Sequence, residues 1–362
     1  MKRSEMTIRR ALMALLCALL LCGCAQQETA SADIALPEKT ETPQQAEAPG
    51  QAETPESTKT SAGICVLLGN AASSASLRMA LGVQEYAAFS GLDIFVRGSE
   101  SGEDAKCAEL IRNAVAEKPT ALCIAFCEGS KTDAALSEAR AAGIKVVVCG
   151  ASELKNFDAC ILPADNAVLG ATIMDALAEA MGEKGSYALM SVAGAGERES
   201  EIVSGAVEHQ KEVYPEMELS GEPADCGKDS DSAYKAALEL MKAEPELEGI
   251  AVSADFVMQG AARAVGELEN EMHLAGTGMP QENAGLLQNG FVSAMVSGDP
   301  SLDIQAACSL ARMLLKGGVP EEHSDLGVVG YNDLSPVKNA QNVFAGSNIT
   351  IVTMENLNAI SY

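Results

Sequence analysis

Residues 121–150 read ALCIAFCEGSKTDAALSEARAAGIKVVVCG, and this stretch decides the fold class. It holds two short apolar runs, 121–126 and 144–149, with a helix-like segment at 131–142 that Gly143 ends. Neither apolar run alternates with polar residues, so both faces of each strand are expected to be buried. Two parallel strands joined by a helix form a βαβ unit, the building block of a doubly wound sheet.

The same alternation of strand-like and helix-like segments extends over the chain from Gly63 onward. The other predicted strands are 63–70, 92–96, 159–162, 186–192, 249–253, 273–276 and 292–296. The other predicted helices are 77–89, 104–116, 166–181, 198–212, 230–243 and 301–316, with one more between the strands 249–253 and 273–276. Strands separated by helices predict parallel sheets covered on both faces. We therefore predict an α/β fold with two doubly wound parallel sheets.

The first residues follow a different pattern. Four basic residues precede an apolar run at 11–21, which is shorter than the roughly 20 residues that span a bilayer. A basic start, a short apolar run and a small residue before a cut site are typical of a secretory signal. The ending Leu21-Cys22-Gly23-Cys24 resembles the lipobox of bacterial lipoproteins. That resemblance implies a signal peptide at 1–23 and lipidation of Cys24; the alternative is an ordinary signal peptide in which Cys24 is incidental.

A segment rich in Gln, Glu, Thr, Ala and Pro follows Cys24 and extends to residue 62. It holds almost no large apolar side chains, so it cannot bury enough surface to offset its ordering entropy. Its prolines favour a partly extended spacer. Residues 24–62 are therefore predicted to be a lipidated, disordered tether that carries a folded body.

Charge and motif content argue against several classes of function. The chain has 25 Lys and Arg against 51 Asp and Glu, a net charge of −26, whereas nucleic-acid binding requires a basic surface. Its 3 histidines lie far apart, and Gly194-x-Gly196 lacks the third glycine of a dinucleotide fingerprint. No nucleophile elbow or phosphate loop is present in the sequence. We expect no catalysis, no cofactor and no metal.

Cysteines are frequent, at 11 in the chain. In an exported protein this number invites a disulfide interpretation. However, Cys65, Cys123 and Cys149 lie inside apolar runs, where a thiol packs as a small hydrophobic side chain. We expect most of the cysteines in the body to be unpaired and buried.

Seven segments, in order, resemble type I periplasmic binding proteins, the sugar-binding branch of ABC-importer solute receptors. They are GVQEYAAFSG at 82–91, AAGIKVVV at 141–148, DNAVLG at 165–170, LELMKAEPELEGI at 238–250, SADFVMQGA at 253–261, GTGMP at 276–280 and DPSL at 299–302. The last two are more similar to rhamnose and autoinducer-2 receptors than to ribose receptors. The resemblance covers the body from Gly63 to about Asn358.

The resemblance implies two Rossmann-like lobes joined by hinge strands. Residues 63–163 with 299–325 would form the N-terminal lobe, 164–298 the C-terminal lobe, and 326–362 a segment that crosses back between them. A small polar solute, carbohydrate or carbohydrate-like, would bind between lobes that close over it. The partner would be an ABC permease, reached from the outer face of the bacterial membrane. Two alternatives are a ligand-presenting sensor for a histidine kinase or chemoreceptor, and a receptor that has lost its solute.

The loops after the strands hold the candidate binding residues, because such folds bind ligands beyond the carboxyl ends of their strands. They differ from typical sugar receptors, with Ala75 and Ser76 where an aromatic pair is common and Gly278 in place of an aspartate. The remaining candidates are Ser73, Ser74, Ser76, Glu128, Ser152, Glu153, Glu197, Arg198, Asp255, Phe256, Gln281 and Asp299.

Asp255 is the strongest single candidate, because a carboxylate at a strand-to-helix turn can accept hydrogen bonds from ligand hydroxyls. Phe256 is the aromatic residue that we expect to cover an apolar ring face. Helix capping is the alternative role for Asp255 and the serines, and solvation is the alternative for Glu128 and Glu153.

Replacing the predicted lipidation site tests the anchor. Cys24→Ser should abolish lipidation and release a soluble, folded body, because the tether alone has no apolar surface to insert. The measurement is the distribution of protein between membrane and soluble fractions after a high-salt wash. A variant that stays with the membranes would show that the lipoprotein interpretation is wrong.

Overall fold

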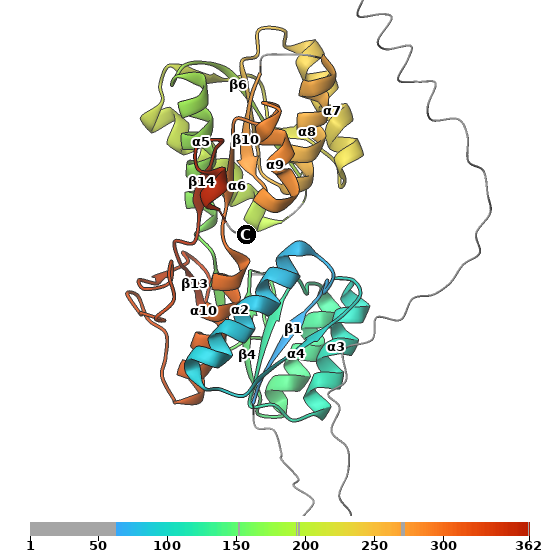
Figure 1. Cartoon of the computed structure of the whole chain (residues 1–362), viewed down its shortest axis with the longest axis vertical. Helices are drawn as coiled ribbons and strands as arrows, with labels where there is room; N and C mark the ends of the chain where they lie inside the picture. The colour runs from blue at the N-terminus through green and yellow to red at the C-terminus, as the bar shows by residue number, and fades with distance from the viewer. Residues whose placement is uncertain (1–62, 151–152, 193, 195, 269–271, 361) are drawn as a thin grey trace, which may run out of the picture. The chain divides into compact units, whose positions relative to one another are not determined.

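The computed structural model describes residues 63–150, 153–192, 194, 196–268, 272–360 and 362 (Figure 1). The predicted signal peptide, the tether with Cys24, and Ser152 lie outside these ranges. Within them the chain forms two mainly parallel sheets with helices on both faces, so the predicted α/β class is confirmed.

The first sheet has the strand order β12-β13-β5-β4-β3-β1-β2. All its pairings are parallel except that of β12 with β13. Its strands are β1 (Ile64–Leu68), β2 (Ile94–Gly98), β3 (Ala121–Ala125), β4 (Lys145–Cys149), β5 (Ala159–Leu162), β12 (Ser335–Pro336) and β13 (Val343–Ala345). Helices α2 (Ser74–Ser90) and α10 (Pro300–Leu315) pack on one face, and α3 (Asp104–Ala116) and α4 (Ser130–Ala141) on the other.

The second sheet has the order β14-β11-β10-β9-β6-β7, with β8 beside β6. Its strands are β6 (Gly185–Ser191), β7 (Met217–Leu219), β8 (Ala224–Asp225), β9 (Gly249–Val252), β10 (His273–Thr277), β11 (Ala294–Ser297) and β14 (Thr350–Val352). Helices α5 (Asn166–Met181) and α6 (Glu197–Val213) cover one face. Helices α7 (Ser230–Ala243), α8 (Asp255–Leu268) and α9 (Pro280–Gln288) cover the other.

The chain passes between the two sheets three times: from β5 to α5, from β11 to α10, and from β13 to β14. Asn348 holds these crossovers together. Its backbone N–H donates to the Pro163 carbonyl at 2.8 Å, and its side-chain Nδ2 donates to the Asp299 carbonyl at 2.9 Å. A β-carbon on Gly298 would lie 2.2 Å from the Asn348 carbonyl oxygen, so only glycine permits this approach. After this crossing, a terminal 3₁₀ turn, η2 (Leu357–Ala359), follows β14.

Most elements agree with the sequence prediction, including the short strand β5 at the predicted residues 159–162, whereas several of the shortest strands were not predicted. Helix α7 begins and ends where it was predicted, whereas α9 lies in a region where no helix was predicted. Pro280 stands at the start of α9, a position where proline's missing N–H costs nothing. Strands β7, β8, β12, β13 and β14 are too short to produce a clear periodicity and were not predicted.

The described cysteines are all buried, and seven of them are free thiols, which agrees with the prediction for most of the cysteines. The free thiols are Cys65, Cys107, Cys123, Cys127, Cys149, Cys226 and Cys308; Cys160 is buried as well. Burial raises the pKa of the Cys65 thiol to about 12, so its reactive thiolate is scarce at neutral pH.

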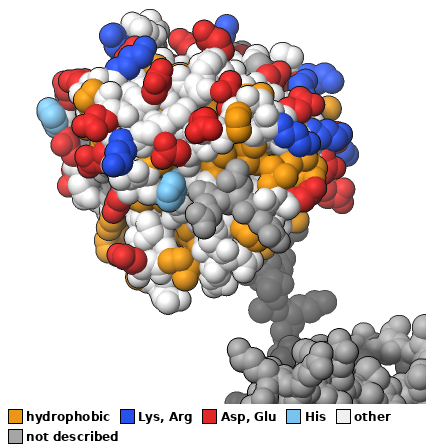
Figure 2. Space-filling view, turned by 90° about the horizontal axis from the view of Figure 1, so that it is seen from above, with side chains coloured by type: hydrophobic (Ala, Val, Ile, Leu, Met, Phe, Trp, Pro, Cys, Tyr) orange, Lys and Arg blue, Asp and Glu red, His pale blue; other side chains and the backbone are white. Residues whose placement is uncertain are grey.

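The surface is acidic overall, as the composition requires. Figure 2 shows Asp and Glu side chains spread over one face of the molecule, interspersed with Lys and Arg. The excess of acidic residues in the chain favours solubility.

Two glycines set the distance between α5 and α6 in the second lobe. A β-carbon on Gly170 would lie 2.0 Å from the Ile202 carbonyl oxygen, and one on Gly205 would lie 2.3 Å from the Ala167 carbonyl oxygen. Both contacts are with backbone, which cannot move aside as a flexible side chain can. The two helices can therefore pack this closely only with glycine at both positions.

Gly170→Ala should destabilise the folded chain by about 1–3 kcal/mol, because the added methyl group forces α5 and α6 apart. Gly285→Ala is the matched control, since a β-carbon there meets no atom within 4 Å. That control should be neutral or stabilising by up to about 1 kcal/mol. Urea unfolding of both variants measures the difference; equal stability of the two would contradict the proposed constraint.

Candidate functional site

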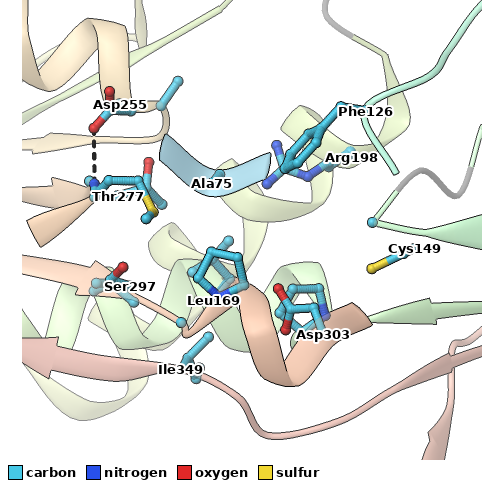
Figure 3. A pocket seen from close by; sticks show the side chains of 18 of the residues that line it. Ala75, Phe126, Cys149, Leu169, Arg198, Asp255, Thr277, Ser297, Asp303 and Ile349 are labelled. Carbon is cyan, nitrogen blue, oxygen red and sulfur yellow. Dashed lines mark hydrogen bonds between the residues drawn. The ribbon is translucent and has the colours of Figure 1, made fainter. Parts of the chain in front are cut away.

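A cavity of about 440 Å³ lies where the carboxyl ends of strands from both sheets meet (Figure 3). Phe126 and Cys149 follow or end strands of the first sheet, and Asp255, Thr277 and Ser297 follow or end strands of the second. The crossovers also contribute Pro163, Gly298 and Ile349 to its lining. A concave site of this size suits a small molecule.

Apolar side chains make up much of the cavity wall. Ala75 and Met79 come from α2, and Leu169 comes from α5. Phe126 supplies an aromatic ring and is 40% exposed. Its φ is 57°, and Gly69 makes room for this backbone, since a β-carbon there would lie 1.8 Å from the Phe126 carbonyl oxygen. Gly69 thus permits the backbone conformation that places Phe126 at the cavity wall.

Asp255 lines the cavity as the first residue of α8. Its Oδ1 accepts hydrogen bonds from the Met279 N–H at 3.1 Å (Figure 3) and from Asn283 Nδ2 at 2.6 Å. Its Oδ2 accepts one from Gln259 Nε2 at 2.8 Å. Burial raises the pKa of Asp255 above its ordinary value, although the bonds from Met279 and Asn283 oppose the shift. The carboxylate is therefore fixed in orientation before any ligand binds.

A second carboxyl group, Asp303, lines the cavity from the first turns of α10. Its side chain accepts hydrogen bonds at Oδ1 from the Tyr331 hydroxyl and from Asn348 Nδ2, each at 2.5 Å. Burial raises the pKa of Asp303 to about 6, although both of these bonds oppose the shift. A buried carboxyl group with a raised pKa at a cavity wall is typical of a functional residue.

Three of the residues chosen from the sequence line this cavity: Glu128, Arg198 and Asp255. Arg198 stands in the first turn of α6 and is exposed. No ion pair joins it to another residue in the described part of the chain.

The three candidate serines at the start of α2 do not line the cavity. Ser73 caps the helix, accepting from the Ser76 N–H at 3.2 Å. The Ser74 hydroxyl donates to the Glu282 carboxylate of the other lobe. Ser76 is fully buried, and its hydroxyl has no partner among the described residues. In this helix turn it is Ala75, between these serines, that lines the cavity.

Asp299 is the N-cap of α10 and lies outside the cavity wall. It forms a two-bond ion pair with Arg78, in which Arg78 Nε and Nη2 donate to Oδ1 and Oδ2 at 2.9 and 2.7 Å. Burial alone would raise the pKa of Asp299, but the bonds from Arg78 and Ser301 lower it overall. The pair fastens α2 to α10.

The other candidates also lie away from the cavity wall. Glu153 and Glu197 border a separate depression, and Phe256 packs against the hydrophobic core of the second lobe. Gln281 is exposed on α9. Ser152 is outside the described residues.

Sequence reasoning missed Phe126, Thr277, Ser297 and Asp303. The first three directly follow or end a predicted strand, which was the available signal. The signal for Asp303 was weaker: it is a carboxylate among the apolar residues of a predicted helix.

The sequence matches the periplasmic binding protein domain over residues 64–318, and the chain belongs to this family. No curated protein matches it. Solved structures share the fold at low sequence identity. The arabinose-binding protein AraP from Geobacillus stearothermophilus is 17% identical with a TM-score of 0.71, covering 83% of this chain and 99% of that one. LsrB from Clostridium saccharobutylicum, solved in complex with AI-2, is 15% identical with a TM-score of 0.66. The match covers 83% of this chain and 99% of LsrB.

Across the described residues, no three His, Cys, Asp or Glu side chains come together as metal ligands would. No helix in the described part of the chain combines the length and apolarity that a membrane crossing requires.

The raised pKa of Asp303 predicts a specific pH dependence of stability. The folded protein holds the proton of the Asp303 carboxyl group more tightly than the unfolded chain does. The protonated group therefore contributes its full stabilisation to the folded state below about pH 4, and this stabilisation is lost as pH rises through about 6. This increase in the pKa of Asp303 corresponds to about 3 kcal/mol. Asp303→Asn should remove this dependence, so its stability relative to the parent chain should rise by about that amount between about pH 4 and pH 8.

Urea unfolding across this pH range measures the effect, and taking the difference between chains cancels the titration of all other groups. Asp231→Asn is the matched control, because the Asp231 side chain is 74% exposed. A relative stability of Asp303→Asn that does not change with pH would contradict the raised pKa.

Proposed function

We propose that this protein is a solute receptor for an ABC importer, and that it captures a small polar molecule, carbohydrate or carbohydrate-like, in the cavity between its lobes. The observation that carries the proposal is this cavity, enclosed by strand ends of both sheets in a chain of the periplasmic binding protein family. An arabinose-binding protein and sugar-transporter proteins share the fold, which supports a sugar-like solute.

The lining of the cavity supports a ligand with one apolar face and several hydroxyl groups. Phe126 and Met79 offer apolar contact, while Asp255, Arg198 and Glu128 offer hydrogen-bonding groups. We infer that these polar residues orient the solute, and that Asp255 accepts from its hydroxyls. A closed site of this kind strengthens each such bond, because water is excluded.

The proposal also covers location and partner. The lipobox-like ending at Cys24 and the tether after it support anchoring at the outer face of a bacterial membrane, where an ABC permease would receive the solute. The GTGMP and DPSL segments support a place near the rhamnose and autoinducer-2 receptors. The protein is proposed to bind without catalysis: among the described residues, no histidine lines the cavity, and burial raises the pKa of the Cys149 thiol that does.

A thermal-shift screen of pentoses, hexoses, deoxyhexoses, polyols and the furanosyl autoinducer tests the proposal. A ligand at about 100 times its dissociation constant should add about 2.7 kcal/mol to the unfolding free energy. Phe126→Ala should then weaken binding of the best compound about tenfold, because the variant loses the aromatic face. Phe89→Ala is the matched control, since Phe89 is 84% exposed and outside the cavity.

Two outcomes would contradict the proposal. A screen in which no compound stabilises the protein would argue against a sugar-like solute. Equal affinity of Phe126→Ala and Phe89→Ala would argue that binding takes place outside this cavity.

A further inference from the structure

We propose that Asp303 contacts the solute directly and connects it to the crossovers between the lobes. Its Oδ2 would accept a hydrogen bond from a ligand hydroxyl, while its Oδ1 stays bound to Tyr331 and Asn348. The inference rests on the proposed function, because it requires a hydroxyl-bearing solute in the cavity.

The two oxygens of Asp303 have different surroundings. Oδ1 accepts both hydrogen bonds, from Tyr331 and from Asn348. Oδ2 accepts no hydrogen bond from the described residues. In the described part of the chain, Ser76 Oγ is the only fully buried side-chain N or O atom that lacks a hydrogen-bond partner, so Oδ2 is not fully buried. Asp303 lines the cavity and is otherwise buried, with 8% of its surface exposed (Figure 3). The remaining acceptor therefore faces the cavity.

The bonds at Oδ1 lead directly into the hinge. Asn348 Nδ2 donates to Asp303 and to the Asp299 carbonyl, and the Asn348 backbone N–H donates to the Pro163 carbonyl. These residues belong to the three crossovers between the sheets. A solute held by Oδ2 would thus be connected through Asp303 and Asn348 to all three crossovers between the sheets.

The charges around Asp303 leave its carboxylate without a cation. Asp299, on the same helix, raises its pKa further, although Arg78 neutralises Asp299 itself. The Tyr331 hydroxyl faces it from the C-terminal segment and the Cys149 thiol from β4, and Tyr362 interacts with it electrostatically.

Across the cavity, the charged groups are Glu128, Arg198 and Asp255. None of the ion pairs in the described part of the chain includes Asp303. A buried carboxyl group without a cationic partner costs stability, which a purely structural role does not account for.

The experiment measures dissociation constants by calorimetry for L-arabinose, D-allose, D-galactose and the furanosyl autoinducer, from about pH 5 to about pH 8. In the parent chain, the best of these probes should bind about tenfold more weakly at the acid end, because a protonated carboxyl group makes a weaker hydrogen bond. Asp303→Asn should bind at least about tenfold more weakly at about pH 8, and its affinity should depend less on pH than that of the parent chain, because only Asp255 remains as a buried carboxyl group with a raised pKa at the cavity. Asp231→Asn, which changes an exposed aspartate, should match the parent chain.

Tyr331→Phe separates a direct role from a structural one. The Tyr331 hydroxyl lowers the pKa of Asp303, so its removal should move the midpoint of the binding titration to higher pH while leaving Oδ2 in place. A structural role alone would leave that midpoint unchanged. This variant also keeps the proposal testable if Asp303→Asn does not fold.

The outcomes distinguish the two proposals. If the parent chain binds a probe and Asp303→Asn binds it equally well at about pH 8, the role of Asp303 is overturned and the proposed function stands. An unshifted midpoint in Tyr331→Phe overturns the role of Asp303 as well. If no probe binds the parent chain at any pH, the proposed function fails, and this inference fails with it.

Discussion

The hydrogen bonds of Asn348 fix the arrangement on which the cavity depends. Three crossovers join the sheets, and one asparagine binds the Pro163 and Asp299 carbonyls while its own backbone lies against Gly298. Because the carboxyl ends of parallel strands meet at one edge of each sheet, holding the crossovers together also brings those two edges face to face. The cavity is a consequence of this junction and requires no additional element.

Asp299, the N-cap of α10, and Asp303, in the first turns of that helix, show how surroundings decide the role of a carboxylate. Asp299 has a guanidinium group and a helix N-terminus, so its charge is compensated and its pKa is lowered. Asp303 has only uncharged donors and is buried, so its pKa rises. Asp299 holds α2 and α10 together with its charge compensated by Arg78. Asp303 carries a buried charge that lacks a cationic partner and therefore destabilises the folded protein, and this charge lies beside the cavity.

Features that depend on a local sequence pattern could be predicted, whereas features that depend on partners far away in the sequence could not. Continuous apolar runs such as that of β4 identify buried parallel strands, because burial on both faces leaves no polar positions. Strand ends then locate the cavity, which is why Asp255 was found. Asp303 lies inside a helix, and its surroundings come from Tyr331 and Asn348, far away in the sequence. Such long-range partners produce no local pattern.

The buried cysteines have a consequence for the route by which the chain folds. In the folded state their thiols are inaccessible, with the pKa of Cys65 and Cys226 raised to about 12. In an unfolded chain the same thiols are exposed and able to form mismatched disulfides, which the folded packing has no room for. Protection of these thiols therefore begins only when the sheets close. The fold is therefore suited to surroundings without a strong thiol oxidant.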